Sequence, residues 1–129
     1  MSTHVVLVGH GSRSAEANAT LVALARTLAA DLALPVHAAF LEICEPAIPA
    51  TLRAAAAAGA TRIVTVPYFL SPGMHVRRDI VAIVDAERAE LGIPIEIAAF
   101  LGSHPELPRL LADVARVALG TPSPAVTKA

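Results

Sequence analysis

The sequence predicts an α/β fold of the flavodoxin-like kind, a three-layer sandwich in which helices flank a single four-stranded, mostly parallel sheet. Short apolar runs rich in β-branched residues alternate along the chain with longer segments that carry apolar residues at helical spacing. The short runs are apolar nearly throughout, which is typical of parallel strands buried on both faces. With 129 residues, of which 55% are apolar, the chain can form one compact domain with its own core.

Four strands and four helices follow from these patterns. The strands are expected at His4–Val8, Pro35–Leu41, Ile63–Tyr68 and Ile95–Leu101. The helices are expected at Ser14–Leu32, Pro46–Ala58, His75–Leu91 and Pro105–Leu119. Gly59 and Gly92 stand where helix C-caps belong, and Ser103 with Glu106 fits a capping box before the last helix. Residues 1–119 are predicted to form a single domain, and residues 120–129 a disordered tail.

Composition excludes several classes of function. Ten basic and eleven acidic residues leave no positive field for nucleic acid, and the low aromatic content of 3% argues against base stacking. The apolar stretch Ile63–Val76 is interrupted by prolines and is shorter than the roughly 20 residues of a membrane span. The N-terminal residues lack the basic region of a signal peptide, so a cytoplasmic protein is expected. The single cysteine, Cys44, cannot form an internal disulfide or a thiolate metal site.

Reactive side chains follow the predicted strands, at the edge where parallel sheets bind ligands. These segments are Gly9–Arg13, Glu42–Glu45, Ser71–His75 and Gly102–His104. Three of the five histidines fall in them. His4 and His37 lie within strands and are expected to be structural.

Three residues of this edge are candidates for metal binding. His10 stands between two glycines, which leave room for a ligand, although a tight turn would explain the same residues. His75 opens a helix with Asp79 one turn later, placed to hold its second ring nitrogen, although the helix dipole alone favours an acidic residue there. Glu42 could complete a site of two histidines and one carboxylate, or accept protons. His104 is a reserve candidate.

Three separated motifs resemble the short sirohydrochlorin chelatases of the CbiX and SirB type, in the class II chelatase superfamily. These motifs are Leu7–Arg13, Phe40–Glu42 and Val66–Leu70 followed by Gly73, His75, Asp79 and Ile80. The resemblance runs in order from about Val5 to Gly102. It implies a lyase that inserts a divalent metal into sirohydrochlorin during cobalamin or siroheme biosynthesis, with cobalt first and ferrous iron next.

The resemblance also implies roles for individual residues. His10, His75 and Glu42 would contact the metal and carry the reaction, and the metal is a substrate, so no permanently bound cofactor is expected. Ser12, Arg13, Arg77 and Arg78 are candidates for binding the carboxylates of the tetrapyrrole, although each arginine could equally be an ordinary surface residue. The chain supplies one domain where larger members have two, so a homodimer is expected. The segment before the fourth strand lacks the histidine-rich stretch of many nickel-inserting relatives.

Three other classes of protein are alternatives to this interpretation. A non-catalytic carrier of metal or tetrapyrrole would need the same ligands. A phosphohistidine phosphatase also places a histidine after its first strand, but it needs an arginine immediately before it, where this chain has Gly9. A receiver-type signalling domain would need an acidic pair where this chain has Gly9 and His10.

Overall fold

A computed structural model describes residues 2–121 of the chain. It contains one fully parallel sheet with the strand order β2-β1-β3-β4. The strands are β1 (Thr3–Gly9), β2 (Val36–Phe40), β3 (Arg62–Pro67) and β4 (Ile95–Ile97). The predicted α/β fold and all four strands are therefore confirmed. The predicted tail, residues 120–129, lies outside the described residues from position 122 onward.

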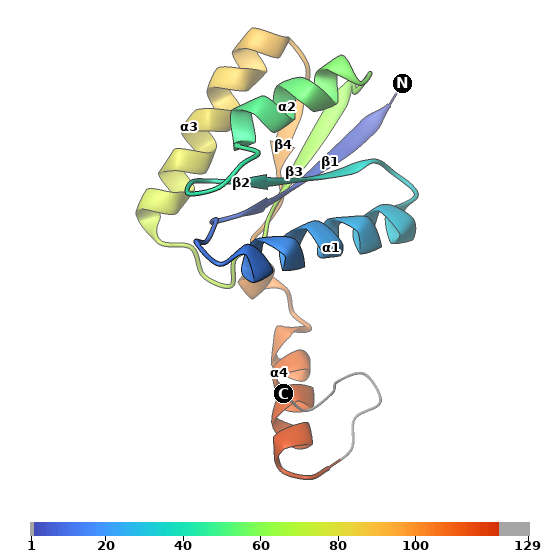
Figure 1. The fold of residues 1–129 in the computed structure, drawn as a ribbon, viewed down its shortest axis with the longest axis vertical. Helices are drawn as coiled ribbons and strands as arrows, with labels where there is room; N and C mark the ends of the chain where they lie inside the picture. Colours follow the sequence, from blue (N-terminus) through green and yellow to red (C-terminus); the bar gives the residue numbers. More distant parts are fainter. Residues whose placement is uncertain (1, 122–129) are drawn as a thin grey trace.

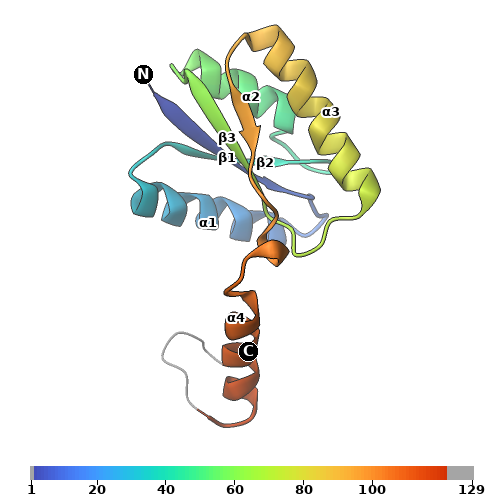
Figure 2. The same ribbon diagram turned by 180° about the vertical axis from the view of Figure 1, so that it is seen from behind.

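Three helices form the outer layers of the sandwich (Figures 1 and 2). Helix α1 (Ala15–Leu32) covers one face of the sheet, where it packs mainly against β2 and β1. Helices α2 (Ile48–Ala57) and α3 (Met74–Leu91) cover the opposite face. A core lies between the sheet and each helical layer, and the core beneath α2 and α3 is the larger one.

The fourth strand is shorter than the sequence predicts. Ile95–Ile97 pairs with β3, but the expected extension to Leu101 is wrong. The chain leaves the sheet because it turns onto the loop after β3, where the Gly102 amide donates to the Phe69 carbonyl. A Cβ at Gly102 would collide with the Leu70 carbonyl, so this close approach needs a glycine.

The predicted capping box is also wrong. Ser103 belongs to a short 3₁₀ helix, η1 (Leu101–Ser103), and its hydroxyl donates to the Phe100 carbonyl at 2.8 Å. Glu106 precedes α4 (Leu107–Ala118), but its carboxylate accepts from Arg109 and no side chain caps the helix. The final helix therefore begins without the local hydrogen bonds that the Ser-x-x-Glu pattern predicted.

Helix α4 does not join either helical layer. It extends away from the sheet beyond η1, and both views show it standing clear of the other helices (Figures 1 and 2). None of its residues is buried, although its leucines and valines recur at helical spacing. The expectation that all four helices flank the sheet thus holds for three of them. No helix of the described residues is long and apolar enough to cross a membrane.

His4 and His37 meet at the opposite end of the sheet from the predicted site. Their rings stack with centroids 5.1 Å apart, and Nδ1 of His4 lies 2.9 Å from Nε2 of His37. Burial, and secondly the proximity of His4, lowers the pKa of His37. These contacts agree with the structural role expected for both residues.

Candidate active site

His10 and Glu42 meet at the carboxyl edge of the sheet. His10 Nε2 lies 3.1 Å from Oε1 of Glu42, and His10 Nδ1 lies 3.3 Å from the Gly11 carbonyl. A neutral imidazole that donates from Nδ1 to this carbonyl leaves the lone pair of Nε2 facing a carboxylate. A single proton between these two acceptors satisfies both, and a cation can take its place. Both side chains are about half exposed, so a ligand can reach them.

Hydrogen bonds that extend the sheet bring the two loops together. Beyond the ends of β1 and β2, the Leu41 amide donates to the Gly9 carbonyl at 2.9 Å and the Glu42 amide donates to the His10 carbonyl at 3.0 Å. Gly11 has a φ of +99° beside this junction, and a Cβ there would collide with the Glu42 carbonyl oxygen. Gly11, the second glycine of the Gly-His-Gly pattern, is therefore needed for the approach of the Glu42 loop.

Asn18 holds the loop after His10 and was not singled out by sequence reasoning. Its Oδ1 accepts from the Ser12 amide at 3.0 Å, and its Nδ2 donates to the Ser12 carbonyl at 2.7 Å. Ser14 caps α1 by accepting from the Ala17 amide, which fixes the other end of the same loop. One feature of the sequence could have identified Asn18. Asparagine is unfavourable inside a helix unless its side chain has local hydrogen-bond partners, and Asn18 stands in the first turns of a predicted helix.

The structure does not gather His75 with the other two predicted ligands. His75 is the second residue of α3, after the N-cap Gly73, and Asp79 makes no hydrogen bond to its ring within the described residues. Between residues 2 and 121, no group of three or more His, Cys, Asp and Glu side chains lies close enough to hold one metal ion. The three-residue ligand set thus remains a prediction, of which the structure assembles His10 and Glu42.

The candidate substrate-binding arginines differ in their surroundings. The guanidinium of Arg77 lies 4.4 Å from the ring centroid of Phe100, a cation–π contact that fixes its position. Arg13 and Arg78 are exposed, and within residues 2–121 neither forms an ion pair. His104, the reserve candidate, accepts a hydrogen bond at Nδ1 from the Glu106 amide at 3.0 Å. Its side chain therefore stabilises the segment that leads into α4.

Two cavities meet at Tyr68. The smaller, of about 250 Å³, lies over His10 and the Ser12 loop and reaches Phe69. The larger, of about 690 Å³, is an almost entirely apolar groove on the α1 face of the sheet. His10 lines the smaller cavity and contacts Glu42 beside it, so this cavity is the candidate active site despite its size.

Comparisons with known proteins agree with this architecture. The CbiX family model matches residues 4–118. The chloroplastic sirohydrochlorin ferrochelatase of Arabidopsis thaliana is 36% identical over 112 residues, which cover 85% of this chain and 48% of that protein. The sirohydrochlorin cobaltochelatase of Methanocaldococcus jannaschii is 43% identical over 77 residues, which cover 59% of this chain and 54% of that protein.

A solved structure shares the whole fold. The CbiX protein from Marinobacter aquaeolei, described as a cobalamin biosynthesis protein, superposes with a TM-score of 0.82 at 28% identity, covering 93% of this chain and 99% of its own. The chain spans about half the length of the curated relatives it matches. Because the family model covers nearly all of the described residues, the chain belongs to the CbiX family.

Proposed function

We propose that this protein is a sirohydrochlorin chelatase, which inserts a divalent metal into sirohydrochlorin on the route to cobalamin or siroheme. The observation that carries the proposal is the contact between His10 and Glu42 at the carboxyl edge of a CbiX-family fold. The names of the relatives, sirohydrochlorin ferrochelatase and sirohydrochlorin cobaltochelatase, support the same substrate.

Metal insertion exchanges two protons for one divalent cation. The ion forms bonds to the four ring nitrogens, and the two pyrrole N–H groups lose their protons, so no electrons are transferred. A neutral imidazole of His10 can hold the partly dehydrated ion, Glu42 beside it can accept one released proton, and the second proton passes to the solvent that reaches this exposed edge. We propose His75 as the second imidazole ligand, supplied from the first turn of α3.

We propose that arginines bind the carboxylates of the substrate at this edge. Sirohydrochlorin carries many carboxylates, which the guanidinium groups of Arg13, Arg77 and Arg78 can pair with. Arg77 is the strongest candidate of the three because Phe100 already fixes its position, which lowers the entropy lost on binding. Ser12 adds a hydroxyl within the loop that Asn18 holds.

The proposal also ranks the metals that the enzyme inserts. Cobalt is the first choice and ferrous iron the second, since both occur in the names of the relatives, and nickel is third. The metal is a substrate, so we propose no permanently bound cofactor. The cytoplasmic location expected from the sequence remains a prediction.

A homodimer is proposed as the working form. A cavity of about 250 Å³ over His10 is below the roughly 300–1,000 Å³ typical of small-molecule sites. A second copy facing the carboxyl edge would enlarge the site and present a second set of ligands to the same macrocycle.

The test is an anaerobic absorbance assay of sirohydrochlorin with cobalt, ferrous iron or nickel, in the presence and absence of the protein. We expect the protein to accelerate the spectral change of insertion, and the rates to rank the metals. A protein that binds the ion without accelerating insertion would be a carrier, which is the second candidate function, and the chelatase proposal would be wrong.

A further inference from the structure

The phenylalanine and tyrosine rings of this chain are gathered at one edge of the sheet. The sequence has three phenylalanines, one tyrosine and no tryptophan. Phe40 is the last residue of β2, and Tyr68 and Phe69 follow β3. Phe100 lies between β4 and η1, so every one of these rings stands at the carboxyl end of a strand. Aromatic rings supply large contact areas and stack on other π systems, so the edge that holds the candidate active site also suits a flat, conjugated ligand.

Three of these rings already have partners within the fold. Phe40 is 3% exposed and belongs to the core beneath α1. Phe69 is partly buried and packs against the core on the opposite face. The ring of Phe100 lies under the guanidinium of Arg77 at 4.4 Å. Tyr68, in contrast, is 44% exposed, so it is the ring of the four that can offer the most surface to a ligand.

The sheet fixes the position of Tyr68 beside the candidate active site. Its amide donates to the Val8 carbonyl at 2.7 Å, which continues the pairing of β1 and β3 one step beyond Pro67. Two residues after Val8 the chain reaches His10. Among the described residues, Tyr68 alone lines both the cavity over His10 and the apolar groove on the α1 face. Tyr68 therefore forms the boundary between a polar cavity and an apolar surface.

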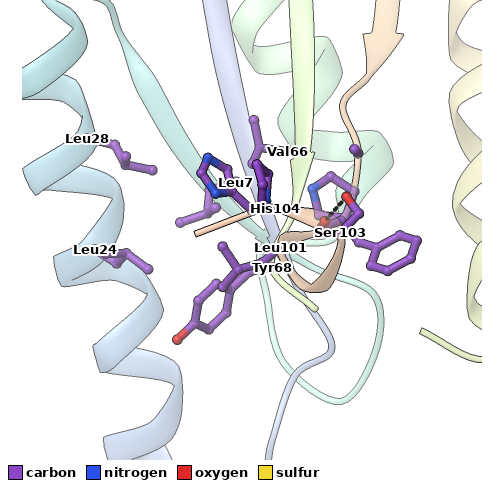
Figure 3. A pocket seen from close by; sticks show the side chains of 12 residues that line it. Leu7, Leu24, Leu28, Val66, Tyr68, Leu101, Ser103 and His104 are labelled. Atoms are coloured by element: carbon purple, nitrogen blue, oxygen red, sulfur yellow. Dashed lines mark hydrogen bonds between the residues drawn. The ribbon is translucent and has the colours of Figure 1, made fainter. Parts of the chain in front are cut away.

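The hydroxyl of Tyr68 is available as a hydrogen-bond donor. Within residues 2–121 it takes part in no hydrogen bond. In Figure 3 the Tyr68 ring stands beyond Leu7 and Val66, and its hydroxyl points away from both. A phenol that donates to a carboxylate forms a charge-assisted hydrogen bond, which is stronger than one between neutral groups. The side chain thus combines a flat apolar ring with an unused donor.

We propose that Tyr68 is a substrate-binding residue, whose ring packs against the macrocycle of sirohydrochlorin and whose hydroxyl donates to one of its carboxylates. This inference rests on the proposed function, because it takes sirohydrochlorin as the ligand of the His10 cavity. That cavity, of about 250 Å³, is below the roughly 300–1,000 Å³ of small-molecule sites, so a tetrapyrrole extends past its rim. Tyr68 forms this rim on the α1 side, whereas Arg77 belongs to α3 on the other face of the sheet.

The first test observes Tyr68 directly, because it is the sole tyrosine of the chain. Protein labelled with ¹³C in its tyrosine ring is titrated with metal-free sirohydrochlorin, and binding is followed in parallel by the absorbance of the tetrapyrrole. We expect the ring current of the macrocycle to shift the Tyr68 signals, with the same Kd as the absorbance change. Binding by absorbance without a shift of Tyr68 would overturn this inference and leave the proposed function standing. An absence of binding by absorbance would reject the proposed function, and this inference with it.

The second test separates the hydroxyl from the ring. Tyr68→Phe is expected to raise the Kd for metal-free sirohydrochlorin about tenfold, because it removes a hydrogen bond to a charged group. Tyr68→Leu is expected to raise the Kd further, because the aromatic contact is lost as well. The kcat of cobalt insertion should change much less than the Kd in both variants, since Tyr68 does not hold the ion in this account.

A control variant and a stability measurement distinguish substrate binding from a structural role. Leu28→Ala alters the wall of the apolar groove without touching the cavity over His10, so its Kd should equal that of the unmodified protein. The thermal midpoint of Tyr68→Phe should be unchanged, because the missing hydroxyl has no partner among the described residues. An unchanged Kd in Tyr68→Phe, or an equal rise of the Kd in Leu28→Ala, would overturn the assignment of Tyr68.

Discussion

His10 Nε2 lies 3.1 Å from Glu42 Oε1, although the two residues belong to loops that follow different strands. The contact depends on the parallel register of β1 and β2, whose hydrogen bonds continue past both strand ends into these loops. An imidazole nitrogen and a carboxylate oxygen therefore lie within hydrogen-bond distance at the solvent-accessible edge of the sheet. This is the arrangement that an exchange of protons for a metal ion requires.

Glu42→Gln is expected to slow metal insertion at least tenfold, because an amide cannot accept the pyrrole proton. The measurement is the initial rate of cobalt insertion at saturating sirohydrochlorin. Glu45→Gln is the matched control, since it removes a carboxylate of the same loop that makes no ion pair within the described residues. Equal rates for the two variants would contradict the role of Glu42.

Gly11→Ala is expected to lower the insertion rate strongly while leaving the fold intact. The φ of +99° costs an alanine about 1–2 kcal/mol, and its Cβ would push away the Glu42 carbonyl. Gly59→Ala shares the backbone strain, with a φ of +105°, but has open space around the Cβ. Both variants should lose stability in urea, Gly11→Ala more than Gly59→Ala because of the displaced carbonyl, and only Gly11→Ala should lose activity. A fully active Gly11→Ala would show that the approach of the two loops is not needed.

Asn18→Ala is expected to release the Ser12 loop and weaken substrate binding. The variant leaves the amide and the carbonyl of Ser12 without their side-chain partners, at a cost of about 1–3 kcal/mol. The KM for sirohydrochlorin should rise more than kcat falls. Asn18→Asp keeps the acceptor for the Ser12 amide and should recover part of the loss, whereas a variant with unchanged KM would show that this loop does not meet the substrate.

Stability is expected to fall at acidic pH because of the histidine pair at the other end of the sheet. The lowered pKa of His37 means that the unfolded chain binds more protons than the folded one between the lowered value and the ordinary value of 6.5. The free energy of unfolding therefore decreases as the pH falls below about 6.5 through the lowered pKa.

The check on the histidine pair is the thermal midpoint between about pH 8 and pH 5. His37→Gln should flatten this dependence because the titrating ring is gone, whereas His104→Gln, which removes an exposed histidine of the connector, should retain it. An unchanged slope in His37→Gln would assign the pH dependence to other groups.

The sequence was sufficient to predict the layers of the fold and half of the candidate site. Apolar strands and helical spacing are local signals, and a parallel sheet brings the residues after its strands to one edge, so His10 and Glu42 could be predicted to meet. The end of β4 could not, because it depends on the long-range contact of Gly102 with the loop after β3. The Ser103 hydroxyl bonds to the Phe100 carbonyl in a 3₁₀ turn that competes with the predicted cap. Asn18 was missed for another reason, because its partner is the backbone of the nearby Ser12 and a loop conformation is not a periodic signal. For α4, the apolar face predicts burial but does not identify the surface that it packs against.

The measurement that tests the central claim most directly is the initial rate of cobalt insertion into sirohydrochlorin by His10→Ala, compared with the unmodified protein and with free metal. Removal of this imidazole takes away both the proposed metal ligand and the partner of Glu42. The rate is expected to fall to that of free metal while circular dichroism remains unchanged. A folded His10→Ala variant that inserts cobalt at the rate of the unmodified protein would contradict the assignment of this edge as the active site.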